Sequence, residues 1–151
     1  MNRRNFLSFA GGLVAISIMP IDLSAKDYRK LKPDVWTAHT IDEATKALYG
    51  VREIIETDKI KIKVPKINSS GAKVPVTFET SIDAKTVALF QDANPESAVA
   101  VFNVGPYDVK KYGAKIKMAK DGILMVLVEG TDGNIYMAKA ATKVAAGGCE
   151  G

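Results

Sequence analysis

Apolar and polar positions alternate in short runs along most of the chain, which is the pattern of β-strands. In the clearest run, Ile60, Ile62 and Val64 are separated by Lys61 and Lys63, as expected of a strand with one face in water. Comparable runs predict further strands over residues 74–80, 86–91, 98–104, 115–118, 123–128 and 135–144. Sequences that favour turns separate these runs, at 68–71, 94–95, 105–106, 121–122 and 131–134.

The run 123–128 differs from the others because every one of its positions is apolar. A strand with this composition has no face suited to water, so we expect both of its faces to be covered.

One helix is predicted before the strands. Thr40 and Glu43 have the spacing of a capping box, in which each side chain bonds the other residue's backbone N–H. Apolar residues then recur at helical spacing, at Ala44, Leu48, Val51 and Ile55. The helix is expected to end near Gly50 or to continue to about Glu56, because glycine is unfavourable inside a helix and common at its end.

These elements predict a mainly β fold, an antiparallel β-sandwich of about seven strands preceded by one short helix. The chain has 151 residues, of which 25% are charged and 47% hydrophobic, so one globular domain is expected. That domain is predicted over residues 40–144. Residues 26–39, which include Pro33 and show no regular period, are expected to be a linker.

The first 25 residues have the features of an export signal. Arg3 and Arg4 precede Phe6, as in twin-arginine signals, and a short apolar run, 9–18, follows. The run is too short for a good transmembrane helix. We expect cleavage after Ala25 and a periplasmic protein with no membrane span after signal removal. An uncleaved membrane anchor remains open, because Leu23 is large for its place before the cut.

The candidate chemistry lies in the last residues, 145–151, which we expect to be a flexible tail. Cys149 is the only cysteine of the chain, and Gly147, Gly148 and Gly151 surround it with residues that restrict neither access nor backbone motion. The tail could reach roughly 20 Å when extended. Glu150 and the terminal carboxylate place negative charge beside the sulfur, which disfavours the reactive thiolate. This thiol is therefore expected to react inside the sites of other proteins.

Other kinds of site have little support in the sequence. His39 is the only histidine, lies in the expected linker and is predicted to be a surface residue. Spacings typical of metal ligands or phosphate-binding loops are missing, so no metal and no cofactor are predicted. A basic stretch could attract an anionic substrate or an acidic partner, or could be a solvated strand face: Lys110, Lys111, Lys115, Lys117 and Lys120. Nucleic acid is disfavoured, since the net charge is only +4 and the protein is expected to be exported.

The ending Gly147–Gly148–Cys149–Glu150–Gly151 resembles the Gly-Gly-Cys-x-Gly terminus of the SoxY family of thiosulfate oxidation. Glu150 departs from the family, in which glycine is usual at that position. Weaker similarity covers most of residues 26–151, at 60–65, 71, 74–76, 93–95 and 115–119.

The resemblance implies an immunoglobulin-like fold and a carrier that is not itself an enzyme. Cys149 would be the covalent attachment point for sulfur intermediates, and the tail glycines would give it access. The implied partners are a SoxZ-like subunit, exported as a passenger with the carrier, and separate haem, manganese and molybdenum enzymes of the Sox system.

A different class of function remains open. An exported immunoglobulin-like module could use Cys149 to form a lasting intermolecular disulfide and so serve as an assembly component. A thiol-disulfide oxidoreductase is disfavoured, because the chain has no second cysteine to resolve a mixed disulfide.

Overall fold

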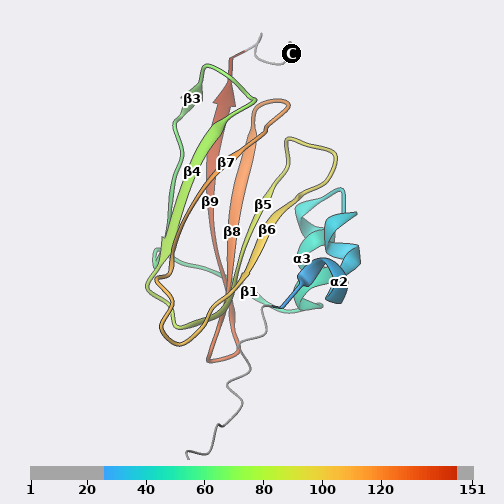
Figure 1. Ribbon diagram of the computed structural model, residues 1–151, viewed down its shortest axis with the longest axis vertical. Coiled ribbons are helices and arrows are strands. Elements are labelled where there is room, and N and C mark those ends of the chain that lie inside the picture. Colours follow the sequence, from blue (N-terminus) through green and yellow to red (C-terminus); the bar gives the residue numbers. More distant parts are fainter. Residues whose placement is uncertain (1–25, 146–151) are drawn as a thin grey trace, which may run out of the picture.

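The computed structural model describes residues 26–145, which form a β-sandwich with helices on one outer face (Figure 1). The predicted signal segment, 1–25, and residues 146–151, including Cys149, lie outside the described residues. The strands are β1 (Ile54–Glu56), β2 (Ile60–Lys63), β3 (Ile67–Asn68), β4 (Val74–Thr80), β5 (Ala84–Gln91), β6 (Ala98–Asn103), β7 (Lys111–Ile116), β8 (Gly122–Gly130) and β9 (Ile135–Val144).

The strands form two sheets. The larger sheet is six-stranded with the order β1-β9-β8-β5-β6, and β3 also pairs with β9; the smaller sheet has the order β2-β4-β7. Neighbouring strands are antiparallel except for the two short strands β1 and β3, which run parallel to β9. The predicted immunoglobulin-like sandwich is confirmed, with these parallel pairings added to it.

The core has two parts, one on each face of the larger sheet. Between the sheets, Phe78 of β4 packs in one cluster with Leu89 and Val126 of the larger sheet. On the outer face, Leu127 and Phe90 pack with Val35 from the helical segment. Val126 and Leu127 are successive residues of β8 and thus point into different clusters. Both side chains are fully buried. The prediction that the 123–128 strand is covered on both faces is confirmed.

The main helix, α3, spans Ile41–Tyr49, and its predicted capping box is present. The Glu43 amide donates to Thr40 Oγ1 at 3.2 Å, and the Thr40 amide donates to Glu43 Oε2 at 3.2 Å. Gly50 ends the helix with a φ of 77°, a conformation that other residues rarely adopt. The possible extension to Glu56 is wrong: Val51 is 91% exposed, and Ile55 lies in β1.

Residues 26–39 are not the irregular linker that was expected. They contain a helical turn, α2 (Tyr28–Leu31), and a 3-10 turn, η1 (Pro33–Trp36). Val35 is fully buried, and Trp36 Nε1 donates to the Tyr28 carbonyl at 3.2 Å. The segment is ordered because its apolar side chains complete the cluster on the outer face of the larger sheet.

Most strand boundaries agree closely with the sequence pattern, and β4 and β9 have the predicted limits. The largest shift is in β7, which begins at Lys111 instead of Lys115. Tyr112 explains this earlier start, because its ring stacks on Phe102 and Phe78 with centroids 4.5 and 5.3 Å apart. The strands β1 and β3 were not predicted.

Candidate functional site at the end of strand β9

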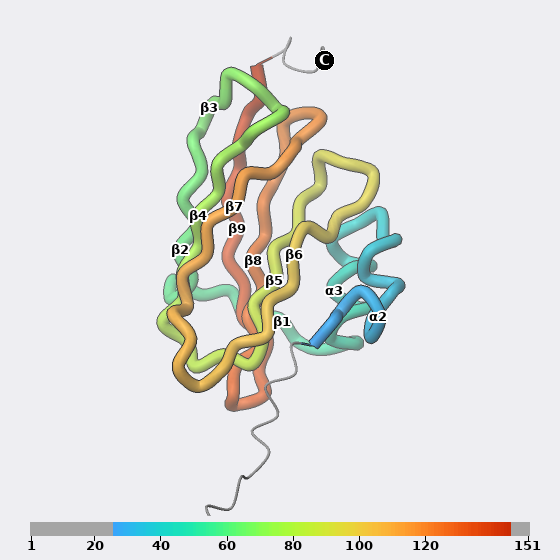
Figure 2. The backbone as a smooth tube through the Cα atoms, in the orientation of Figure 1, coloured from blue at the N-terminus to red at the C-terminus, as the bar shows by residue number. Residues whose placement is uncertain are grey.

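The predicted site residues, Cys149 with Gly147, Gly148 and Gly151, lie outside the described residues. The structure does describe the point from which this tail leaves the sandwich. Strand β9 ends at Val144, and Ala145 is the last residue described. The β3–β4 connection and the β7–β8 turn lie at the same end of the sandwich as this exit (Figure 2).

Main-chain bonds to β3 hold the last residues of β9. Ile67 and Asn68 pair in parallel with Lys143 and Val144. The Lys143 amide donates to the Lys66 carbonyl at 2.9 Å, and the Ala145 amide donates to the Asn68 carbonyl at 2.8 Å. The chain is therefore fixed to the sandwich as far as Ala145.

A buried polar pair reinforces this attachment. Asn68 Nδ2 donates to Thr142 Oγ1 at 2.7 Å, and Thr142 Oγ1 donates to the Pro65 carbonyl at 2.6 Å. Asn68 is 6% and Thr142 2% exposed. Buried polar groups stabilise a fold only when they are hydrogen-bonded, so loss of either side chain would remove one of the bonds that satisfy its buried partner.

The other side of β9 is held from the β7–β8 connection. The Val144 amide donates to Asp121 Oδ1 at 2.8 Å, and the Met118 amide donates to the Gly71 carbonyl at 2.8 Å. A Cβ at Gly71 would collide with the Met118 carbonyl oxygen and would lie 2.9 Å from the Val144 side chain. Only glycine allows these segments to approach so closely. We call the set the exit clamp: Asn68, Gly71, Met118, Asp121 and Thr142.

No sequence motif marks the exit clamp. Residues 68–71 were predicted only as a turn, and nothing local marks Asn68 and Thr142 as partners, because 74 positions separate them. The one available signal was the pair of polar residues, Asn68 and Thr142, beside strands that are otherwise rich in apolar residues.

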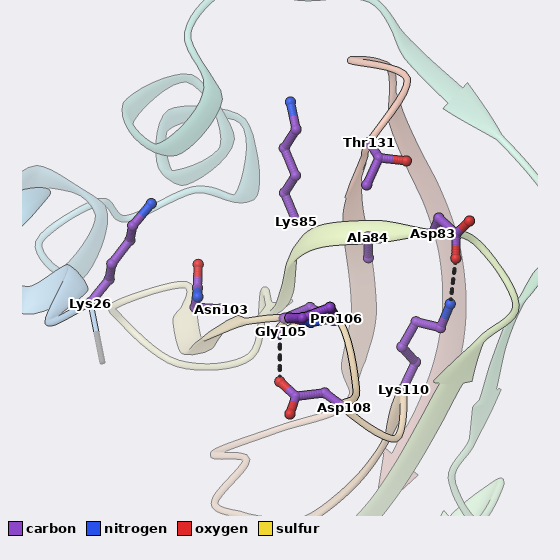
Figure 3. A pocket seen from close by; sticks show the side chains of 11 residues that line it. Lys26, Asp83, Ala84, Lys85, Asn103, Gly105, Pro106, Asp108, Lys110 and Thr131 are labelled. Carbon is purple, nitrogen blue, oxygen red and sulfur yellow. Dashed lines mark hydrogen bonds and ion pairs between the residues drawn. The ribbon is translucent and has the colours of Figure 1, made fainter. Parts of the chain in front are cut away.

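The clearest hollows of the described residues lie at the opposite end of the sandwich. One, of about 530 Å³, lies between the β6–β7 loop and the start of β5 (Figure 3). Three of its charged groups have partners: Lys110 Nζ lies 3.0 Å from Asp83 Oδ1, and the Gly105 amide donates to Asp108 Oδ2 at 2.6 Å. Lys26 and Lys85 also line it and form no ion pair within residues 26–145. This hollow lacks a nucleophile or acid–base pair that would suggest catalysis.

The other chemically active side chains of residues 26–145 have structural or surface roles. His39 is exposed, as predicted, with its Nδ1 2.9 Å from the Pro95 carbonyl oxygen. The Tyr49 hydroxyl lies 2.9 Å from Thr86 Oγ1, and burial raises its pKa, so it stays neutral at any physiological pH. Within the described part of the chain, no group of acidic, histidine or cysteine side chains is arranged to hold a metal.

Comparison with known families decides the identity of the chain. The family described as sulfur oxidation protein SoxY matches residues 45–149, which include almost the whole sandwich and reach Cys149. The chain belongs to the SoxY family. A solved SoxY, the sulfur carrier protein from Chlorobium limicola f thiosulfatophilum, is 38% identical, with a TM-score of 0.64. That match covers 70% of this chain and 96% of the Chlorobium protein.

Structures from outside the SoxY family share only the fold. A superoxide reductase (neelaredoxin) from Ignicoccus hospitalis is 14% identical, with a TM-score of 0.54, over 61% of this chain and 94% of that protein. The search of curated proteins gives no match. In the described range 26–145, none of the helices is long and apolar enough to cross a membrane.

Proposed function

We propose that this SoxY-family chain carries sulfur intermediates covalently on Cys149 and presents them to separate enzymes of thiosulfate oxidation. The observation that carries the proposal is the family match, which runs through the sandwich and ends at the cysteine itself. The Chlorobium relative is described as a sulfur carrier protein. A single cysteine leaves no ambiguity about the attachment atom.

The chemistry requires other proteins at each step. When thiosulfate is joined to the Cys149 sulfur, a sulfur–sulfur bond forms, and the thiol proton and an electron pair leave, the electrons passing to a haem enzyme. Hydrolysis of the terminal sulfonate then releases sulfate and leaves a persulfide on the cysteine, in a step assigned to a manganese hydrolase. A molybdenum enzyme would oxidise the remaining sulfane sulfur. In this scheme the chain contributes attachment and presentation, and the enzymes contribute catalysis.

The exit clamp suits this role. Its bonds fix the chain up to Ala145, so the tail begins from a defined point of the sandwich and its reach is set by residues 146–151 alone. A fixed base raises the effective concentration of the sulfur near an enzyme bound at this end.

The proposal also includes export and a partner. We propose a periplasmic location reached by the twin-arginine route, and a heterodimer with a SoxZ-like subunit. Cell fractionation tests the location, and recovery of the mature chain mainly in the cytoplasm would contradict it.

Replacement of Cys149 tests the carrier function directly. Cys149→Ser is expected to fold normally and to pair with the same partner, but to abolish thiosulfate oxidation in cells. The matched measurement is the intact mass of the wild-type protein, purified without reductant from cells supplied with thiosulfate. Adducts of sulfur or thiosulfonate on Cys149 support the carrier. Sustained oxidation in the Cys149→Ser strain would refute it.

The same mass measurement separates the second candidate. An assembly module would yield disulfide-linked dimers through Cys149 and no sulfur adducts, whether or not thiosulfate was supplied. The single cysteine favours this candidate only in the sense that any disulfide it forms must be intermolecular.

A further inference from the structure

Exposed lysines surround the exit of the tail. They come from separate segments that meet at this end of the sandwich and have no ion-pair partner among residues 26–145. We call this set the lysine collar: Lys66, Lys73, Lys117, Lys120 and Lys143.

Main-chain contacts place the collar residues around the end of β9. The Lys66 carbonyl accepts from the Lys143 amide. Lys73 and Lys117 flank the paired residues Val74 and Ile116. Lys120 precedes Asp121, whose carboxylate accepts from the Val144 amide. Every segment that holds the tail base therefore also carries a collar lysine.

The nearby carboxylates are engaged elsewhere. Asp121 Oδ1 accepts from the Val144 amide at 2.8 Å, and Asp92 Oδ1 accepts from the Ile123 amide at 2.6 Å. Neither forms an ion pair with a collar lysine in the described part of the molecule. Both carboxylates keep their charge, but the five collar lysines outnumber them, so the collar has an excess of positive charge that can attract an acidic surface.

We propose that the lysine collar is the docking surface for an enzyme that receives the tail, and that this enzyme has an acidic rim around the entrance to its active site. The inference rests on the proposed carrier function and names the kind of surface it needs. Attraction between the lysine collar and the acidic rim of the enzyme would bring the tail to the entrance in the correct orientation.

The arrangement favours a protein surface over a small anion. The collar lysines lie on different segments around the exit, and two hollows formed by residues 26–145 lie at the far end of the sandwich. Ile67, which lies between Lys66 and Asn68, is 71% exposed. An apolar contact with charged groups around it is typical of protein–protein interfaces.

The test compares two variants with the same change of charge. In the collar variant, Lys66, Lys117 and Lys143 are each replaced by Gln. In the control variant, the exposed far-end residues Lys59, Lys61 and Lys85 are replaced by Gln. Each is prepared as the mature carrier with whatever small subunit copurifies. Loading by the haem enzyme of the same system with thiosulfate is followed by intact mass, and kcat/KM for the carrier is measured at several salt concentrations.

The collar variant is expected to lower kcat/KM by roughly tenfold at low salt, with the difference shrinking as salt screens the charges. The control variant should stay within about twofold of wild type, since its charges lie away from the exit. Equal effects of the two variants, or a loss that salt does not change, would overturn the proposal.

Measurements without a partner protein test two other ligands of the collar, small anions and a membrane surface. Alkylation of Cys149 by neutral iodoacetamide and by anionic iodoacetate is compared in the wild type and the collar variant. Rates that are the same in both proteins support docking to a protein. A loss confined to iodoacetate and as large as the loss in loading would show attraction of small anions and would overturn the proposal. Collar-dependent binding to phosphatidylglycerol vesicles would also overturn it, in favour of a membrane surface.

Failure of this inference can be told apart from failure of the carrier function. If wild-type Cys149 acquires sulfur adducts but the collar variant loads as well as the control, only the docking surface is wrong. If no adduct forms on wild-type Cys149, the carrier function itself fails.

Discussion

Lysines occur at both ends of the sandwich, and within residues 26–145 some of those at the end opposite the tail form ion pairs. At the end opposite the tail, Lys110 lies 3.0 Å from Asp83, and Lys111 lies 3.5 Å from Glu79. At the tail end, the described part of the chain gives the collar lysines no such partner. At the far end some lysines are paired and others, such as Lys59 and Lys85, are not, whereas at the tail end no collar lysine forms an ion pair within residues 26–145.

The far end also orders its turn with a charged group. Asp132, in the β8–β9 turn, accepts a hydrogen bond from the Tyr136 hydroxyl at 2.6 Å, and this bond lowers the pKa of the carboxyl. At the tail end, the Asp121 carboxylate acts together with the buried Asn68–Thr142 pair and the close approach at Gly71. Stability at the exit comes from the clamp, and its bonds use no collar lysine side chain. The collar charges are therefore available to bind another molecule.

The largest expected effect is at Gly71. Gly71→Ala places a methyl group against the Met118 backbone and should lower the free energy of unfolding by about 2 to 3 kcal/mol. Denaturant unfolding measures the change. The matched control is Gly113→Ala in β7, where the nearest atom to a new Cβ would be Thr77 Oγ1 at 4.0 Å, and a change of less than about 0.5 kcal/mol is expected. Equal losses in the two variants would show that the clamp is not specially packed.

A smaller effect is expected from Asn68→Ala, which removes the donor that Thr142 Oγ1 accepts from. The loss should be about 1 to 2 kcal/mol, because a buried hydroxyl would lose one of its partners. Hydrogen exchange at the Lys143 and Ala145 amides should accelerate more than exchange in the centre of β5. Asn134→Ala, in the exposed far-end turn, is the control and should leave those amides unchanged. Uniform acceleration across the sandwich would mean that Asn68 does not hold the exit in particular.

The smallest effects concern charge, and their sign should differ between the two ends. Asp83→Asn removes a partner of Lys110 and should destabilise the fold by a few tenths of a kcal/mol, roughly the worth of an exposed ion pair. Lys117→Gln removes repulsion within the collar and should stabilise the fold by a similar small amount. Thermal unfolding at low and high salt measures both shifts, which should vanish at high salt. Shifts of the same sign in the unfolding temperatures of the two variants would contradict the proposed difference between the ends.

Local pattern predicted most of the fold. Thr40, Glu43 and Gly50 marked the limits of α3 through chemistry confined to a few neighbouring residues, and alternation gave β4 and β9 their limits. The predictions that were wrong failed for one reason, because contacts between distant parts of the chain decide the structure there. Ile55 fitted a helical period, but it pairs with Tyr136 in β9. Val35 lies in a segment with no period, yet the sheet buries it completely.

The candidate site also combines a residue that has a local sequence signal with residues that have none. Cys149 stays a prediction, which rests on a local signal, a single thiol among glycines, and the family match reaches that residue. The exit clamp could not be found, since its bonds join residues that only the sandwich topology brings together, such as Asp121 and Val144. The basic stretch 110–120 was recognised, but the fold assigns its members to opposite ends: Lys110 and Lys111 form ion pairs, while Lys117 and Lys120 belong to the collar.

The parallel pairing of β3 with β9 has a mechanical consequence. Strand β9 is bonded to β8 along one edge and to β1 and β3 along the other. A pull along the tail would therefore load these hydrogen bonds in shear, all together, instead of peeling them off one at a time. Force applied to the tail by a bound protein would thus be spread over the whole length of β9, and we expect the strand to stay paired.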